Sequence, residues 1–202
     1  LSIVSSGRAL PEHEIRILDE GRRPLGDGYV GEIAVRGPSI ARGYLSNAGQ
    51  DDTFVGGWLH TGDLGFILGG ELYVCGRAKD VLFIEGRTYF PHYLEWAVER
   101  VCGVRSGHAV AFQCDRGSAT SLVVIAEAVS RGREDVGREI RSALLKAARV
   151  TRCVVEVAAR GGLPRSSSGK PRRQPTRELY ERNVLPLLSE GASPETLRSK
   201  IA

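Results

Sequence analysis

The pattern of apolar and polar residues changes at one short segment, residues 76–80, which read Gly-Arg-Ala-Lys-Asp. On its N-terminal side, short alternating runs separated by glycine turns predict β-strands. On its C-terminal side, helical and strand periods alternate, which is typical of an α+β domain. We therefore predict two bodies with a hinge at Asp80: a β-rich subdomain over residues 1–79 and a small α+β domain over residues 80–202.

The N-terminal part contains several short strands. Residues 13–18 and 32–36 alternate apolar and polar side chains, as half-buried strands do. Leu64–Leu68 and Glu71–Cys75 form a further pair, joined by two glycines at positions 69 and 70. A two-residue glycine connection suits a hairpin turn that needs positive φ. These strands predict part of a small barrel or sandwich.

The C-terminal part predicts alternating strands and helices. Pro91 suits the first position of a helix, because its missing N–H would have no partner there. In a helix that starts there, one apolar face would be formed by Leu94, Ala97, Val98, Val101 and Cys102. The other predicted elements are strands over residues 81–84, 108–113, 121–126 and 153–157, and helices over 134–149, 175–182 and 194–201. The resulting order, β-α-β-β-α-β-loop-α, predicts a small α+β domain.

Composition is that of a soluble globular protein, with 42% hydrophobic and 26% charged residues among 202. No apolar run is long enough to span a bilayer, and no signal peptide opens the sequence. We expect a cytoplasmic protein with no membrane span. The sequence starts at Leu1 and contains no Met, which we interpret as a portion of a longer protein.

The four cysteines are widely and irregularly spaced, at positions 75, 102, 114 and 153. This spacing lacks the paired cysteines of zinc sites. Each lies in an apolar stretch, so we predict reduced core cysteines and no metal site.

Residues 160–182 carry the excess positive charge, with seven cationic side chains against two acidic ones. Such a tract predicts an anionic partner: a phosphate, a nucleic acid or an acidic protein surface. Tyr180 is its only aromatic residue for stacking on bases. We therefore expect no nucleic-acid partner.

Two residues near the change of pattern could hold a nucleotide. Asp63 follows Thr61 and Gly62, and its carboxylate could accept hydrogen bonds from both hydroxyls of a ribose. A surface turn is the alternative explanation. Arg77 could hold a phosphate or ribose oxygen with its fork of donors. The alternative is a surface salt bridge with Asp80 or Glu85.

The loop over residues 161–171 contains glycines, three successive serines and Lys170. It does not match a phosphate-binding P-loop, because six residues, and not four, separate Gly162 from Gly169, and Pro171 stands where a Ser or Thr is needed. Lys170 could instead reach a phosphate from a mobile loop and stabilise charge in the transition state. A solvated, disordered basic loop is the alternative.

Three motifs together resemble the adenylate-forming superfamily of acyl-CoA synthetases, luciferases and adenylation domains. They are residues 58–63 (WLHTGD), residues 76–80 (GRAKD) and residues 163–170 (LPRSSSGK). Residues 76–91 are most similar to fatty acyl-AMP ligases, with Arg87 after the second glycine of that motif. Thr88 and Phe90 depart from the subfamily pattern, where Asn and Tyr are usual.

The resemblance implies a role for each candidate residue. Asp63 would bind the ATP ribose, and Arg77 the ribose or the α-phosphate. Asp80 would be the hinge, and Lys170 would bridge the carboxylate and the α-phosphate. ATP and Mg²⁺ would be required, with the Mg²⁺ ligands outside this chain.

The resemblance also implies the reaction and its partners. The chain would be the C-terminal part of an enzyme that activates a fatty acid as acyl-adenylate and passes it to an acyl carrier protein or a polyketide synthase carrier domain. An N-terminal adenylation domain would lie upstream, so the chain alone is expected to be inactive. Two alternatives stay open: an acyl-CoA synthetase or other adenylating domain, and a degenerate module that only binds a partner.

Overall fold

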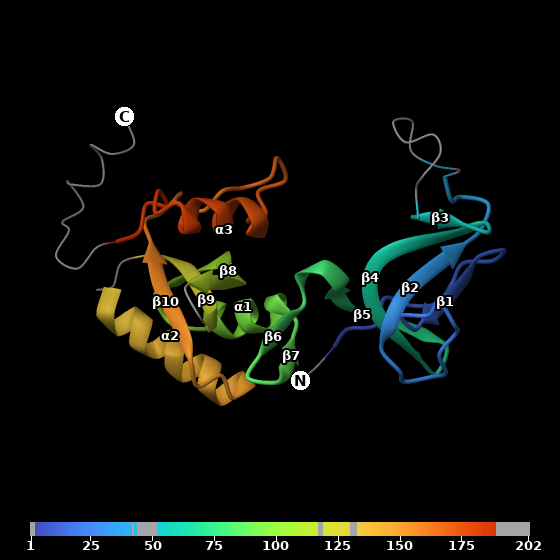
Figure 1. Ribbon diagram of the computed structural model, residues 1–202, viewed down its shortest axis with the longest axis horizontal. Coiled ribbons are helices and arrows are strands. Elements are labelled where there is room, and N and C mark those ends of the chain that lie inside the picture. The colour runs from blue at the N-terminus through green and yellow to red at the C-terminus, as the bar shows by residue number, and fades with distance from the viewer. Residues whose placement is uncertain (1–2, 42, 44–51, 117–118, 130–132, 189–202) are drawn as a thin grey trace. The chain divides into compact units, whose positions relative to one another are not determined.

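The computed structural model describes residues 3–41, 43, 52–116, 119–129 and 133–188. The chain divides into two compact units, Leu1–Val81 and Leu82–Ala202. The first is β-rich and the second combines strands with helices (Figure 1), which confirms the predicted fold class. The division falls two residues beyond the boundary placed at 79/80 from the sequence.

One antiparallel sheet makes up the first unit. β1 (Glu14–Leu18), β2 (Gly31–Arg36), β4 (Trp58–Leu68) and β3 (Phe54–Val55) follow one another in the sheet, and β5 (Glu71–Arg77) also pairs with β4. Ile17, Ile33 and Ala34 are among its buried side chains.

The predicted glycine hairpin is confirmed, because β4 and β5 are joined at Gly69 and Gly70, with φ of 59° and 80°. The predicted start of its first strand was wrong. We expected a strand from Leu64, but β4 already begins at Trp58, so the segment before Asp63 is strand and not loop. Pairing of Leu59 with β2 and β3 extends the strand, and a short sequence window does not contain those partners.

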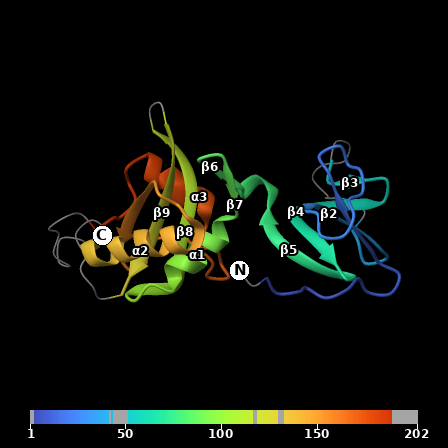
Figure 2. The same cartoon turned by 90° about the horizontal axis from the view of Figure 1, so that it is seen from below.

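The second unit is built on a three-stranded sheet. β8 (Val104–Arg116) runs antiparallel beside β9 (Ala119–Ala128), as Figure 2 shows, and β10 (Cys153–Ala158) is parallel to β9. The helices are α1 (Pro91–Glu99), α2 (Arg133–Ala148) and α3 (Arg173–Glu181). This order confirms the sequence prediction, with one addition. β6 (Leu82–Ile84) pairs with a further short strand, β7 (Arg87–Tyr89), which is absent from the predicted elements.

Each face of this sheet has its own apolar core. Side chains alternate along a strand, so Ala111 and Val124 point to the face covered by α1 and α2, where Leu94, Val98 and Ile140 are buried. The neighbouring residues point to the other face, which α3 covers (Figure 1). There Phe112 meets Tyr180 in a T-shaped contact at 5.7 Å between ring centroids. The sheet is therefore a layer between helices, and the segment before α3 lies against its second face.

The cysteine prediction was only partly right. Cys75 and Cys114 are buried, but Cys153 is half-buried and Cys102 is exposed. Cys102 was placed on the apolar face of the first helix, yet α1 ends at Glu99 and the chain turns before reaching it. Burial raises the pKa of the Cys75 and Cys153 thiols, which keeps them protonated.

The predicted helix over residues 194–201 lies outside the described residues. Within the part of the chain that the structure describes, no helix has the length and apolarity needed to cross a membrane.

Candidate functional site

Asp63 and Arg77 face each other on adjacent strands. They are register partners in the β4–β5 pair, and Arg77 Nε lies 2.8 Å from Asp63 Oδ1. Both remain partly exposed, with side-chain exposures of 32% for Asp63 and 55% for Arg77. The alternative given for Arg77 from the sequence was a surface salt bridge with Asp80 or Glu85. The observed partner lies on the adjacent strand of the hairpin instead. Glu85 accepts hydrogen bonds from the Thr151 hydroxyl.

The Thr61 hydroxyl links the backbone before Asp63 to the neighbouring strand β2. Thr61 Oγ1 donates to the Ile33 carbonyl at 2.8 Å and accepts from the Asp63 N–H at 3.0 Å. Gly62 has a φ of 68°, a region that favours glycine. These bonds fix the main chain on both sides of Gly62 and leave the Asp63 carboxylate at the surface.

Glu32 is a candidate site residue that sequence reasoning missed. Its Oε1 accepts the Gly62 N–H at 3.2 Å, and its Oε2 lies 3.2 Å from Nδ1 of the buried His60. The strand pairing shifts register between Glu32 and Ala34, opposite this segment. The only sequence signal was an acidic residue in an otherwise alternating strand. Glu32 and His60 are 28 positions apart, so a short sequence window does not show their contact.

Lys170 lies at the end of a closed hairpin loop. The Ser166 N–H donates to the Lys170 carbonyl at 2.9 Å, and the Lys170 N–H donates to Ser166 Oγ at 3.1 Å. Gly169, with φ of 80°, donates to the Ser166 carbonyl at 2.9 Å. A turn followed by a left-handed glycine is a common three-residue hairpin connection. The mobile or disordered loop expected from the sequence is thus a hydrogen-bonded turn, because the serine side chain and main chain satisfy its backbone groups.

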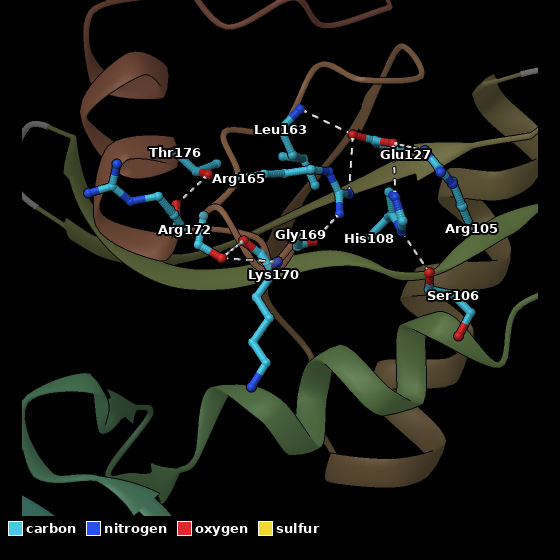
Figure 3. A network of polar contacts seen from close by, with 11 residues as sticks. Arg105, Ser106, His108, Glu127, Leu163, Arg165, Gly169, Lys170, Arg172 and Thr176 are labelled. Carbon is cyan, nitrogen blue, oxygen red and sulfur yellow. Dashed lines mark hydrogen bonds and ion pairs between the residues drawn. The ribbon is translucent and has the colours of Figure 1, made fainter.

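The Lys170 side chain is exposed and extends away from the polar network beneath the hairpin (Figure 3). Among the described residues, none pairs with its ammonium group. A single cation on a fixed backbone, with a flexible stem and three donors, is suited to neutralising a phosphate.

The candidate residues are divided between the two units. Asp63 and Arg77 are brought together in Leu1–Val81, whereas Lys170 belongs to Leu82–Ala202. Asp80 is the last residue of η1 (Ala78–Asp80), a single 3₁₀ turn closed by a hydrogen bond from Val81 N–H to the Ala78 carbonyl. Only Val81 separates it from the division between the units.

A metal site was not expected in this chain. Across the described ranges, no three His, Cys, Asp or Glu residues gather as ligands for a metal ion.

Residues 2–45 match the family model described as AMP-binding enzyme. The chain is 34% identical to 4-hydroxyphenylalkanoate adenylyltransferase of Mycobacterium marinum, over 89% of this chain and 32% of that protein. It therefore spans about a third of the length of this curated relative.

Two solved structures are similar to the whole or most of the chain. One is McyG A-PCP complexed with phenylalanyl-adenylate, with a TM-score of 0.80, 29% identity, and coverage of 99% of this chain and 36% of that one. The other comes from the fatty acyl-adenylate ligases of E. coli and L. pneumophila, with a TM-score of 0.77, 32% identity, and coverage of 90% and 33%. Together with the three motifs and the observed fold, these similarities show that the chain belongs to the adenylate-forming superfamily, which includes acyl-CoA synthetases, adenylation domains and fatty acyl-adenylate ligases.

Proposed function

We propose that this chain is the C-terminal part of a fatty acyl-AMP ligase. The enzyme condenses a fatty acid with ATP, releasing pyrophosphate, and transfers the acyl group to the phosphopantetheine thiol of a carrier protein or carrier domain. The observation that carries the proposal is the Asp63–Arg77 pair, which presents an acceptor and a forked donor side by side at the surface. The Asp63 carboxylate suits a ribose diol, and the Arg77 guanidinium suits a phosphate or ribose oxygen.

Lys170 supplies the charge for the first step. A fatty-acid carboxylate oxygen attacks the α-phosphorus of ATP, the bond from that phosphorus to the bridging oxygen breaks, and pyrophosphate leaves. Negative charge on the oxygens around the α-phosphorus is stabilised by a cation placed in advance. The exposed ammonium of Lys170, on its hydrogen-bonded hairpin, fits this role.

The second step joins the acyl group to a thiol. The thiolate attacks the acyl carbon of the adenylate, and AMP leaves with the electrons of the broken carbon–oxygen bond. Arg87 follows the second glycine of the motif at residues 76–91, as in fatty acyl-AMP ligases, so we assign the acceptor as a carrier-bound thiol instead of free coenzyme A. Product analysis with each acceptor tests this: predominant acyl-CoA formation would assign the enzyme to the acyl-CoA synthetases.

Replacing Lys170 tests the first step. In the complete enzyme, Lys170→Ala is expected to lower pyrophosphate release with dodecanoic acid by about 100-fold or more, the scale of losing one transition-state charge contact. ATP binding persists, because Asp63 and Arg77 are unchanged. Lys146→Ala, at an exposed lysine in the last turn of α2, is the matched control and should retain full activity. Near-normal pyrophosphate release by Lys170→Ala would contradict the assignment.

The isolated 202-residue chain provides a separate test. It spans about a third of the relative's length, and we propose that the remainder of the site lies in an upstream adenylation domain. ATP–pyrophosphate exchange should therefore be absent with this chain alone. Robust exchange would show that the active site has been placed incorrectly.

A further inference from the structure

A buried carboxylate lies beneath the Lys170 hairpin. Glu127, on β9, has no exposed surface, although acidic side chains are rarely buried unless they are paired. Its Oε2 lies 3.3 Å from Arg105 Nη1 and 3.8 Å from His108 Nε2. The position is therefore costly for a carboxylate and needs several compensating donors.

The same carboxylate holds the incoming arm of the hairpin. Glu127 Oε1 accepts the Leu163 N–H at 3.2 Å and lies 3.8 Å from Arg165 Nη2 (Figure 3). The other end of the guanidinium, Nη1, donates to the Gly169 carbonyl at 2.6 Å. One guanidinium thus connects the buried charge to the residue directly before Lys170.

Glu127 is the counter-charge for the buried end of Arg165. Arg165 Nη2 is buried and has no hydrogen-bond partner among the described residues. At 3.8 Å, its interaction with Glu127 is electrostatic and not a hydrogen bond. A neutral residue at position 127 would leave that cationic end without compensation, and the guanidinium would then tend to move toward water.

A second carboxylate holds the outgoing arm. Arg173 Nη2 lies 2.8 Å from Glu95 Oε1 on α1, and its Nε donates to the Ala111 carbonyl on β8 at 3.0 Å. Glu95 also accepts the Ala111 N–H at 2.9 Å. The two arms are tied together by the Arg172 N–H, which donates to the Pro164 carbonyl at 2.8 Å. Both ends of the hairpin are thus fastened to the sheet through an arginine and a glutamate.

We infer that Glu127, acting through Arg165, and Glu95, acting through Arg173, are positioning residues that set where the Lys170 hairpin holds its ammonium group. This inference rests on the proposed role of Lys170 in adenylate formation. Small displacements of a reacting group can cost about 100-fold in rate, so an anchor beneath the hairpin is sufficient to change the chemical step.

The test uses Glu127→Gln in the complete enzyme, with ATP and dodecanoic acid and pyrophosphate release as the signal. We expect kcat to fall by about 10- to 100-fold. KM for ATP should stay within about two-fold, because the proposed nucleotide-binding residues Asp63 and Arg77 belong to the other unit. Ile140→Val is the control, because it trims a buried side chain on α2 that does not touch the hairpin. An unchanged kcat for Glu127→Gln, or a loss equal to that of Ile140→Val, would overturn the inference.

A double-mutant cycle separates positioning from a general structural effect. In the Lys170→Ala background, Glu127→Gln should cause no further loss, because its effect passes through Lys170. A multiplicative loss in the double variant would overturn the inference. Arg165→Gln removes the Gly169 contact and leaves Glu127 with Arg105 and the Leu163 N–H. It should reproduce the kcat loss even where Glu127→Gln folds poorly, and wild-type kcat in this variant would also contradict the inference.

Two further results separate this inference from the proposed function. Retention of activity by Lys170→Ala would refute the proposed function itself. Loss of activity in Lys170→Ala with full activity in both Glu127→Gln and Arg165→Gln would leave the proposed function intact and refute only the positioning role.

Discussion

The Nε atom of Arg77 lies 2.8 Å from Oδ1 of Asp63, across the register pair that joins β5 to β4. The pair is partly exposed, so water screens it and its contribution to stability is small. What the pairing does is hold the two side chains side by side without burying either. Because the pair contributes little to folding stability, both side chains are available to bind a ligand.

Asp63→Asn should weaken ATP use without destabilising the protein. The amide keeps the shape of the side chain but loses one charged acceptor, and a hydrogen bond to a charged group is worth about 1.5–3 kcal/mol. KM for ATP is expected to rise by about 10- to 100-fold, with the urea midpoint nearly unchanged. Pyrophosphate-release kinetics and urea unfolding measure the two effects.

Asp19→Asn is the matched control for that experiment. Asp19 also pairs with an arginine in the same unit, since its Oδ2 lies 2.9 Å from Arg23 Nη2. Its loss should leave KM for ATP unchanged. An equal rise in KM for both variants would remove the assignment of Asp63 to the nucleotide.

Gly169→Ala should destabilise the Lys170 hairpin through the backbone alone. The added Cβ would meet no atom within 4 Å, but the φ of 80° is unfavourable for an L-residue. The expected cost is about 1–2 kcal/mol, together with a lower rate of adenylate formation. Gly169→Asn should cost less, because Asn tolerates this region of φ. Urea unfolding and pyrophosphate release provide the measurements.

Gly137→Ala is the comparison for Gly169, because the chemical change is the same and the backbone differs. Gly137 lies within α2, and its new Cβ would meet Arg141 Nη1 at an ordinary 3.6 Å. Alanine is favoured over glycine in a helix by about 0.5–1 kcal/mol, so this variant should be more stable. Destabilisation of both variants by the same amount would argue against a conformational origin.

Asp80→Pro should separate the two half-reactions if Asp80 is the hinge. Proline fixes φ at its own position and disfavours helical geometry at Lys79. A hinge that must change φ and ψ would then be confined to one orientation. Either adenylate formation or thiol acylation should fall sharply while the other persists, as measured by single-turnover assays of each. Asp80→Ala leaves the backbone free and should retain both, and survival of both in Asp80→Pro would exclude the hinge.

Stability should decline below pH 6.5 through His92. Burial and then the nearby Arg173 charge lower the pKa of His92 below its ordinary value of 6.5. The unfolded chain therefore binds a proton at a higher pH than the folded chain does. The stabilisation is complete above pH 6.5 and decreases as the pH falls toward the folded-state pKa.

His92→Gln should remove this part of the pH dependence. The variant also loses ring contacts with Tyr93 and Trp96, which lowers stability by a constant amount at each pH. Urea midpoints measured between about pH 5 and pH 8 should therefore fall less steeply with acid for the variant than for the natural protein. Parallel curves would show that His92 does not titrate differently in the two states.

Local patterns were sufficient for most of the fold. Proline at the start of α1, the glycine pair of the β4–β5 hairpin and the apolar period of α2 each act over a few residues, so a sequence window contains all the atoms that matter. Predictions were wrong where a distant partner decided the outcome. β4 begins early because β2 and β3 pair with it, and Cys102 is exposed because α1 ends before it.

The sequence by itself determined the superfamily, the order of elements and the four candidate residues, because these depend on residue types and short spacings. Only the tertiary structure decided their partners. Arg77 and Asp63 meet through strand register, Glu32 holds the Gly62 N–H from another strand, and Glu127 contacts Leu163 from 36 residues away. Hydrogen bonds and ion pairs act over a few ångströms in space, and the distance along the chain does not record which groups the fold brings within that range.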